Sequence, residues 1–189
     1  MTLILASTSP IRRHMLSAAG VEYRAAAPAV DEAAFKTAAA DDAGLALGLA
    51  VAKARSVAGP WVIGSDSVVS AGGRLFDKPR DRDEAAVHLR AFSGKVMRLS
   101  SAVALARDGE IDWSHVETAS LTVRALSDAF IADYLDAEWP HVGYTVGVFR
   151  LEARGVQLFE QIVGDHFTVL GMPLLPLLNA LRDRGLIGA

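Results

Sequence analysis

Short apolar runs alternate along the chain with segments of helical periodicity, and this alternation constrains the fold more than any other feature. The apolar runs predict strands over residues 3–7, 23–27, 61–64, 96–106, 111–123 and 157–163. The 3.6-residue periodicity and its capping residues predict helices over residues 9–19, 42–57, 81–92, 127–137 and 174–184. A hairpin is predicted at Gly72-Gly73. This order of elements indicates an α/β class.

The length of the chain bounds its domain organisation. With 189 residues, of which 51% are hydrophobic, the chain suits one fairly large domain or two small lobes that share a core. It contains no internal repeat and no low-complexity linker. We therefore predict a single domain over residues 1–189.

The composition argues against several functional classes. The chain has no cysteine, which rules out disulfides, thiolate nucleophiles and cysteine zinc sites. No apolar run reaches the roughly 18 residues that span a membrane, and no secretory signal pattern is present. The net charge is −3 and the basic residues are scattered, so we expect neither nucleic-acid nor membrane binding. We expect a cytoplasmic protein.

The stretch "LILASTSPIRRHML" at residues 3–16 combines a strand, a serine-rich turn and a helix N-terminus. Such an N-terminus offers free N–H groups and a positive dipole end to an anion, and Ser7 can add a hydroxyl. Arg12 and Arg13 in the first turn oppose the dipole unless an anion is bound. The stretch can form an anion site, with a bound polyphosphate as one occupant. The alternative is that Ser9 only caps the helix and the arginines are solvated.

Acidic and basic residues further along the chain can complete such a site. Asp66 follows the apolar run 61–64 and can hold a divalent cation or act as a base, although a solvated turn aspartate is the alternative. Glu32 adds a carboxylate, and Lys53 and Lys78 add cations. Together these residues predict a metal–polyphosphate site. Because the available ligands are hard oxygens, the predicted metal is Mg²⁺ or Mn²⁺.

Nine short motifs occur in an order that resembles the Maf family of nucleoside triphosphate pyrophosphatases. The motifs are "LASTSPIRR", "VDE", "AVAKAR", "IGSDSVV", "DKP", "FSGK", "ET", "GVQLFEQIVGD" and "VLGMPL". They extend from residue 5 to residue 174, and the likeness runs from Leu3 to near Gly185. Each motif is weak alone, but nine in order are highly specific.

The resemblance implies a fold, an activity and a set of site residues. The fold would be like that of inosine triphosphate pyrophosphatases, with an elongated mixed β-sheet flanked by helices and a cleft between two lobes. The activity would be metal-assisted hydrolysis of a nucleoside triphosphate to the monophosphate and pyrophosphate. The protein partner would be a second copy of the chain, forming a homodimer. By family position, the catalytic base would be Asp66, which would bind metal together with Glu32, and the phosphate-binding residues would be Ser7, Arg12, Lys53 and Lys78.

Three positions that differ within the family concern the choice of base, and here they are Ile11, Ser67 and Glu152. The pattern differs from that of dTTP/UTP-hydrolysing members and is similar to that of members acting on 7-methyl-GTP, although Ser67 replaces a glutamine. The Glu152 carboxylate can accept hydrogen bonds from guanine N1–H and N2–H. The positive charge of 7-methylguanine would also be attracted to this carboxylate. We expect 7-methyl-GTP as the substrate. The alternatives are dTTP, UTP or another non-standard nucleotide, or a nucleotide-binding regulator of cell division.

Overall fold

The structure, a computed structural model, describes residues 2–188, with the backbone alone described for residues 36–38. The described strands form a mixed sheet in the order β2-β1-β3-β5-β6-β7, with β4 paired to β3. The strands are β1 (Leu3–Ala6), β2 (Arg24–Ala26), β3 (Trp61–Ala71), β4 (Arg74–Phe76), β5 (Val96–Arg107), β6 (Glu110–Val123) and β7 (Phe159–Val163). The helices are α1 (Pro10–Ala18), α2 (Glu32–Ala38), α3 (Asp42–Arg55), α4 (Arg82–Phe92), α5 (Asp128–Glu138), α6 (His166–Leu170) and α7 (Leu174–Asp183), with the 3₁₀ helices η1 (His141–Tyr144) and η2 (Arg154–Leu158).

The chain divides into two compact units. Unit 1 comprises the residues up to 67, residues 100–118 and the residues from 165 onward. Unit 2 comprises residues 68–99 and 119–164. The boundaries fall inside β3, β5 and β6, so each of these strands contributes residues to both units.

Unit 1 is built on a parallel strand pair. β1 pairs with β3 from Leu3 opposite Trp61 to Ala6 opposite Gly64. Apolar side chains of α1 and α7 pack on one face of these strands. The buried members of this core are Leu3, Leu5, Met15, Leu16, Val21, Trp61, Ile63, Val103, Leu105, Met172, Leu174, Leu177 and Leu181.

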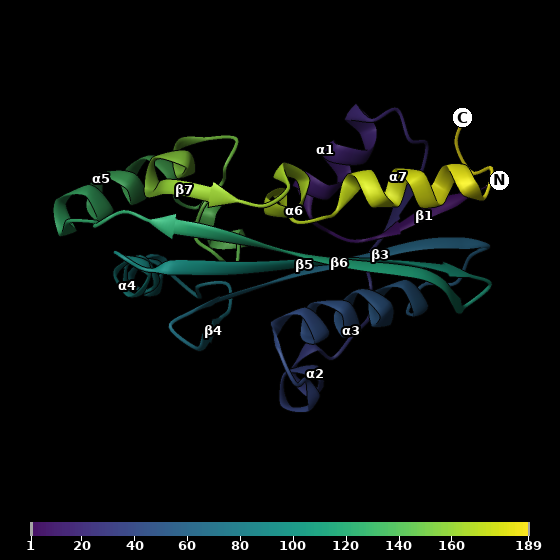
Figure 1. Cartoon of the computed structure of the whole chain (residues 1–189), viewed down its shortest axis with the longest axis horizontal. Helices are drawn as coiled ribbons and strands as arrows, with labels where there is room; N and C mark the ends of the chain where they lie inside the picture. Colours follow the sequence, from purple (N-terminus) through teal and green to yellow (C-terminus); the bar gives the residue numbers. More distant parts are fainter. Residues whose placement is uncertain (1, 189) are drawn as a thin grey trace. The chain divides into compact units, whose positions relative to one another are not determined.

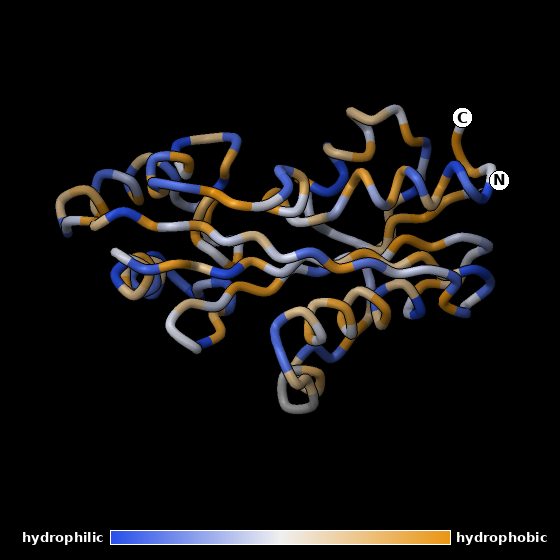
Figure 2. Tube along the Cα trace, viewed as in Figure 1, coloured by the Kyte–Doolittle hydropathy of each residue, from blue (hydrophilic) through white to orange (hydrophobic). Residues whose placement is uncertain are grey.

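Helix α3 lies on the face of the unit 1 strands opposite α1 and α7 (Figure 1). It is largely hydrophobic (Figure 2), and its small buried residues Ala46, Ala50 and Ala54 allow a close approach to β3. A Cβ atom added at Gly64 would lie 2.2 Å from the backbone oxygen of Ala50. Only glycine therefore permits this packing, which fixes the end of α3 against β3.

Unit 2 contains the predicted hairpin and two capped helices. The end of β3 pairs with β4 from Val69 opposite Phe76 to Ala71 opposite Arg74, which confirms the turn at Gly72-Gly73. Helix α4 begins after Asp81, whose carboxylate accepts a hydrogen bond from the Glu84 N–H at 2.8 Å. Helix α5 begins after Ser127, whose hydroxyl accepts from the Phe130 N–H at 3.2 Å.

The α/β prediction is confirmed, and so are most predicted elements, within a few residues at their ends. Helices α2 and α6 were not predicted, because segments of seven and five residues are too short to show a 3.6-residue period. The strand predicted over residues 61–64 instead continues to Ala71 as β3, because polar residues within a strand resemble a turn in the sequence.

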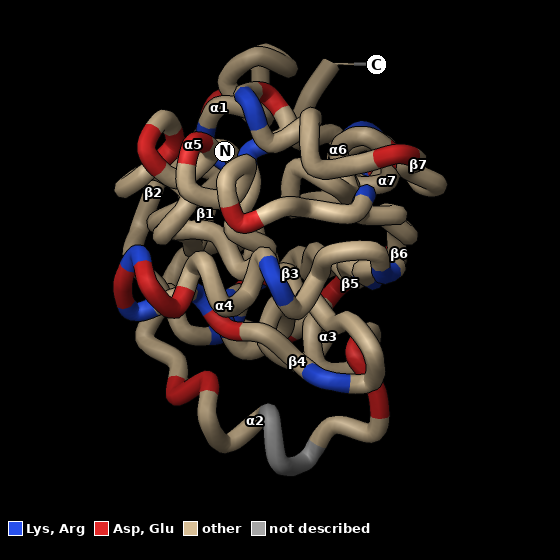
Figure 3. The backbone as a smooth tube through the Cα atoms, turned by 90° about the vertical axis from the view of Figure 1, so that its left-hand side faces the viewer, with Lys and Arg blue, Asp and Glu red and all other residues tan. Residues whose placement is uncertain are grey.

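Lys and Arg are interspersed with Asp and Glu along the chain (Figure 3).

Candidate active site

Seven of the nine predicted site residues belong to unit 1, in which the parallel pairing of β1 and β3 ends just before Ser65. The last paired residues are Ala6 and Gly64, and β3 continues directly into Ser65, Asp66 and Ser67. Asp66 therefore lies inside a strand, and the prediction of a position beyond the strand end is wrong. The site is nevertheless at the carboxyl end of the parallel pair, where open α/β sheets place their ligands.

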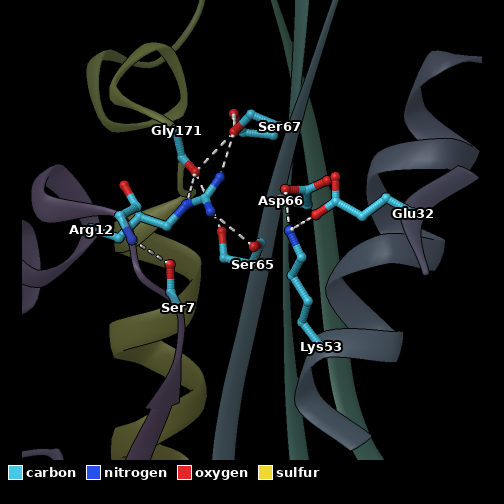
Figure 4. A network of polar contacts seen from close by, with 10 residues as sticks. Ser7, Arg12, Glu32, Lys53, Ser65, Asp66, Ser67 and Gly171 are labelled. Atoms are coloured by element: carbon cyan, nitrogen blue, oxygen red, sulfur yellow. Dashed lines mark hydrogen bonds and ion pairs between the residues drawn. The ribbon is translucent and has the colours of Figure 1, made fainter. Parts of the chain in front are cut away.

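Two carboxylates share one ammonium group in this site. Lys53 projects from the last turn of α3, and its Nζ lies 2.8 Å from Asp66 Oδ1 and 2.8 Å from Glu32 Oε1 (Figure 4). Both side chains are largely buried: 10% of the Lys53 side chain and 13% of the Asp66 side chain are exposed. Because a buried cation is stable only when it is paired, both carboxylates are held close to Lys53 Nζ.

Glu32 reaches Lys53 from the first residue of α2. The preceding Asp31 caps this helix by accepting a hydrogen bond from the Ala33 N–H at 3.1 Å. The "VDE" motif therefore has two separate roles: Asp31 starts the helix, and Glu32 contributes the carboxylate.

The Arg12 guanidinium is buried and donates to three acceptors of unit 1. Nε donates to the Gly171 backbone oxygen at 2.9 Å, and one Nη donates to the Ser65 backbone oxygen at 3.0 Å. The other Nη donates to Ser67 Oγ at 3.0 Å (Figure 4). Burial lowers the pKa of Arg12, whereas Asp66 and Glu32 raise it, and an arginine stays protonated throughout. These hydrogen bonds use three of its five N–H groups, and the other two have no acceptor shown among the described residues.

The turn before α1 differs from the prediction in one respect. Ser9 occupies the N-cap position, but its side chain makes no capping hydrogen bond. Instead, Ser7 Oγ accepts a hydrogen bond from the Ser9 N–H at 3.2 Å, and Ser7 is buried. Arg13 is exposed and donates to the Ser7 backbone oxygen at 3.3 Å. The alternative of two solvated arginines is thus wrong for Arg12.

The carboxylates of Glu32 and Asp66 suit the predicted divalent metal. Among the described residues, no cluster of three or more His, Cys, Asp or Glu side chains could form a complete protein cage for a metal ion. Mg²⁺ commonly binds one or two carboxylates and takes its remaining ligands from waters and substrate phosphates. The donor set therefore fits an ion that binds together with a polyphosphate.

The other predicted residues are placed as follows. Ile11 lies partly buried in the first turn of α1, in unit 1. Lys78 belongs to unit 2, where it is exposed between β4 and α4. Glu152 also belongs to unit 2 and is exposed in the turn that precedes η2.

Several polar residues of the site were not predicted individually. They are Ser65, Ser101, Glu117, Thr168 and Gly171, which hydrogen bond to Arg12, to Ser67 or to one another. Gly171 and Glu117 occur in the motifs "VLGMPL" and "ET", so the order of motifs could have marked these two residues as part of the site. Their partners lie far away in the sequence, so spacing could not reveal the contacts.

No helix in the described part of the chain is both long enough and apolar enough to span a membrane.

Comparisons with known proteins agree with the motifs. The family model described as Maf-like protein matches residues 2–184. A protein named 7-methyl-GTP pyrophosphatase from Rhizobium meliloti is 49% identical over 99% of this chain and 98% of its own length. A protein named nucleoside triphosphate pyrophosphatase from Nitrobacter hamburgensis is 44% identical over 98% of this chain and 95% of its own length.

Among solved structures, the chain is similar to a nucleoside-triphosphatase / dITP/XTP pyrophosphatase from Mycobacterium abscessus. The sequence identity is 15% and the TM-score 0.37, over 67% of this chain and 76% of that one. The assignment of the family rests on the sequence matches, which cover almost the whole chain. The protein belongs to the Maf-like family.

Proposed function

We propose that the protein is a nucleoside triphosphate pyrophosphatase, which hydrolyses its substrate to the nucleoside monophosphate and pyrophosphate. The observation that carries the proposal is the placement of Lys53 between Asp66 and Glu32, at the carboxyl end of a parallel strand pair that also holds Arg12. The names of the Rhizobium and Nitrobacter relatives support the same activity.

The reaction requires a base, and Asp66 has the chemistry for it. A water oxygen attacks the α-phosphorus, the bond from that phosphorus to the bridging oxygen breaks, and pyrophosphate leaves with the bonding electron pair. Asp66 takes the proton of the water. Its carboxylate is held by Lys53 at 2.8 Å, which fixes its orientation.

The cations of the site offset the charge that develops on the leaving group. Lys53 and the two remaining N–H groups of Arg12 are suited to phosphate oxygens, and the buried Ser7 hydroxyl lies beside the N-terminus of α1. Glu32 and Asp66 would hold the divalent metal, Mg²⁺ or Mn²⁺. A bound metal would polarise the phosphate and help neutralise its charge.

The proposed substrate is 7-methyl-GTP. Support comes from the names of relatives, from Glu152 as an acceptor for the guanine edge, and from an apolar Ile11 in place of arginine. The single domain over residues 1–189, the phosphate contact of Lys78, the homodimer and the cytoplasmic location stay predictions.

The activity is tested by incubating the protein with 7-methyl-GTP, GTP, dTTP and UTP in Mg²⁺ or Mn²⁺ and measuring monophosphate and pyrophosphate. Asp66→Asn should lower kcat by about two to four orders of magnitude, because the base is lost. A circular dichroism spectrum and melting curve like those of the wild type would show that the variant is folded. Turnover of none of the four nucleotides by the wild type would refute the proposal.

The preference for a particular nucleobase is tested with Glu152→Gln. We expect this change to lower kcat/KM for 7-methyl-GTP by about tenfold relative to dTTP, because one hydrogen bond to a charged base is weakened. Glu160→Gln, a change at an exposed glutamate of β7, is the matched control. An equal loss on both nucleotides would argue against base recognition by Glu152.

A further inference from the structure

Two serine hydroxyls connect Arg12 to the backbone of α6. Ser67 Oγ lies 3.0 Å from an Nη of Arg12 and 2.8 Å from Ser101 Oγ. Ser101 lies on β5, is fully buried, and its Oγ lies 2.8 Å from the backbone oxygen of Thr168. All four residues belong to unit 1.

The direction of each hydrogen bond follows from the number of protons. Arg12 can only donate, so Ser67 Oγ accepts from it. The Thr168 carbonyl can only accept, so the Ser101 proton points to it. The Ser67 proton then points to Ser101 Oγ, and the chain reads Arg12 to Ser67 to Ser101 to the Thr168 oxygen.

The alternative orientation of Ser67 is less favourable. Its hydroxyl also lies 3.0 Å from the Gly171 oxygen, but that oxygen already accepts from Arg12 Nε at 2.9 Å and has Ser65 Oγ at 3.3 Å. If Ser67 donated to Gly171, Ser101 would have to donate to Ser67 to keep a proton in their 2.8 Å contact, and the Thr168 oxygen would lose the Ser101 proton. Consecutive hydroxyls that donate in one direction also strengthen one another.

The far end of the chain of hydrogen bonds is fixed. Thr168 is fully buried, and its side-chain hydroxyl donates to Glu117. Asp165 caps α6 by accepting from the N–H groups of Phe167 and Thr168 at 2.9 Å and 3.0 Å. The acceptor carbonyl therefore has little freedom to move.

We propose that Ser67 and Ser101 are positioning residues that hold the Arg12 guanidinium for the polyphosphate, whichever base the nucleotide carries. The proposal rests on the proposed function and assigns Ser67 a role different from contact with the base. Once Ser67 donates to Ser101 and accepts from Arg12, it has no proton left to offer a ligand. Ser67 thus governs phosphate binding through Arg12.

Magnesium tripolyphosphate, which has no base, is the probe. Isothermal titration calorimetry should show binding weakened by about fivefold in Ser67→Ala, the effect of losing one net hydrogen bond, and by less in Ser101→Ala. The KM values for 7-methyl-GTP, GTP and dTTP should rise by a common factor, so that the ratios of kcat/KM between nucleotides stay unchanged. Ser67→Thr, which keeps the hydroxyl, should restore both quantities.

Ser100→Ala is the matched control. Ser100 is the neighbour of Ser101 on β5 and is equally buried, but its hydroxyl pairs with Thr118 Oγ1 at 2.8 Å and lies outside the chain of hydrogen bonds to Arg12. It should bind tripolyphosphate like the wild type. An equal loss of binding in Ser100→Ala would show a general packing effect and overturn the proposal.

Two other results would also overturn it. One is a Ser67→Ala variant that binds tripolyphosphate normally but shows altered ratios between nucleotides, which would indicate contact with the base. The other is a wild type that does not bind tripolyphosphate. A wild type that binds tripolyphosphate but hydrolyses no nucleotide would refute the proposed activity alone, and the binding data for the variants would still decide this proposal.

Discussion

At the scale of single residues, the sequence pointed to Arg12 and Arg13 together but not to their different surroundings in the folded chain. Arg12 and Arg13 are neighbours in one helical turn, yet the first is buried with three protein acceptors and the second is exposed. The difference arises from the direction of each side chain on α1, since only Arg12 faces β3. Of the two arginine side chains, only that of Arg13 is exposed to solvent.

His88 in unit 2 carries a prediction at this scale. It is 5% exposed and packs against the rings of Phe76 and Phe92, and its Nδ1 has no hydrogen-bond partner among the described residues. Burial lowers the pKa of His88, and Arg74 lowers it further, while Glu84 and Asp77 oppose the shift. The unfolded imidazole, with a pKa of about 6.5, therefore binds a proton before the folded one as the pH falls.

The stabilisation from neutral His88 is thus complete above about pH 6.5 and is lost as the pH falls towards the lowered pKa of the folded state. We expect the urea midpoint to decrease between pH 7.5 and pH 5, and to decrease less in His88→Met. Urea unfolding at both pH values provides the measurement, and His141→Met, at an exposed histidine, is the control. Equal decreases in wild type and His88→Met would contradict the assignment.

At the scale of elements, the segment between α5 and β7 is held by a buried carboxylate. Glu138, at the end of α5, is 4% exposed and accepts two hydrogen bonds from the Arg150 guanidinium, at 3.1 Å and 2.8 Å. One turn earlier, the Tyr134 hydroxyl donates to the Val148 backbone oxygen at 3.0 Å, and burial raises the pKa of that phenol. Val148 is buried with a φ of 54°, a conformation that a β-branched residue keeps only when its surroundings impose it.

Breaking this pair from one side should be costly. Arg150→Met leaves the Glu138 carboxylate buried without its partner, and we expect the free energy of unfolding to fall by about 3 kcal/mol. The double variant Glu138→Leu with Arg150→Met removes both charges and should recover most of that loss. Urea denaturation of the single and double variants measures both effects. A double variant less stable than Arg150→Met would contradict the expectation.

At the scale of the whole molecule, the α/β class and most elements could be predicted, because apolar periodicity is a local property of the sequence. The proximity of Arg12, Lys53, Asp66 and Glu32 was also predictable, because the ordered motifs mark these residues. The connections within the site were not. Ser67, Ser101, Thr168 and Gly171 meet only in the folded chain, and the extension of β3 through Ser65 and Asp66 depends on its neighbouring strands.

The hydrogen bond between Arg12 and the Gly171 carbonyl spans 159 residues of the sequence. During synthesis on a ribosome, Arg12 and most of unit 1 therefore emerge long before the carbonyl that holds the guanidinium in place. A nascent chain that ends before Gly171 has the acidic and basic residues of the site but lacks one of the acceptors of Arg12. The predicted site therefore gains all three protein acceptors of Arg12 only after the chain has been synthesised past Gly171, near the end of translation.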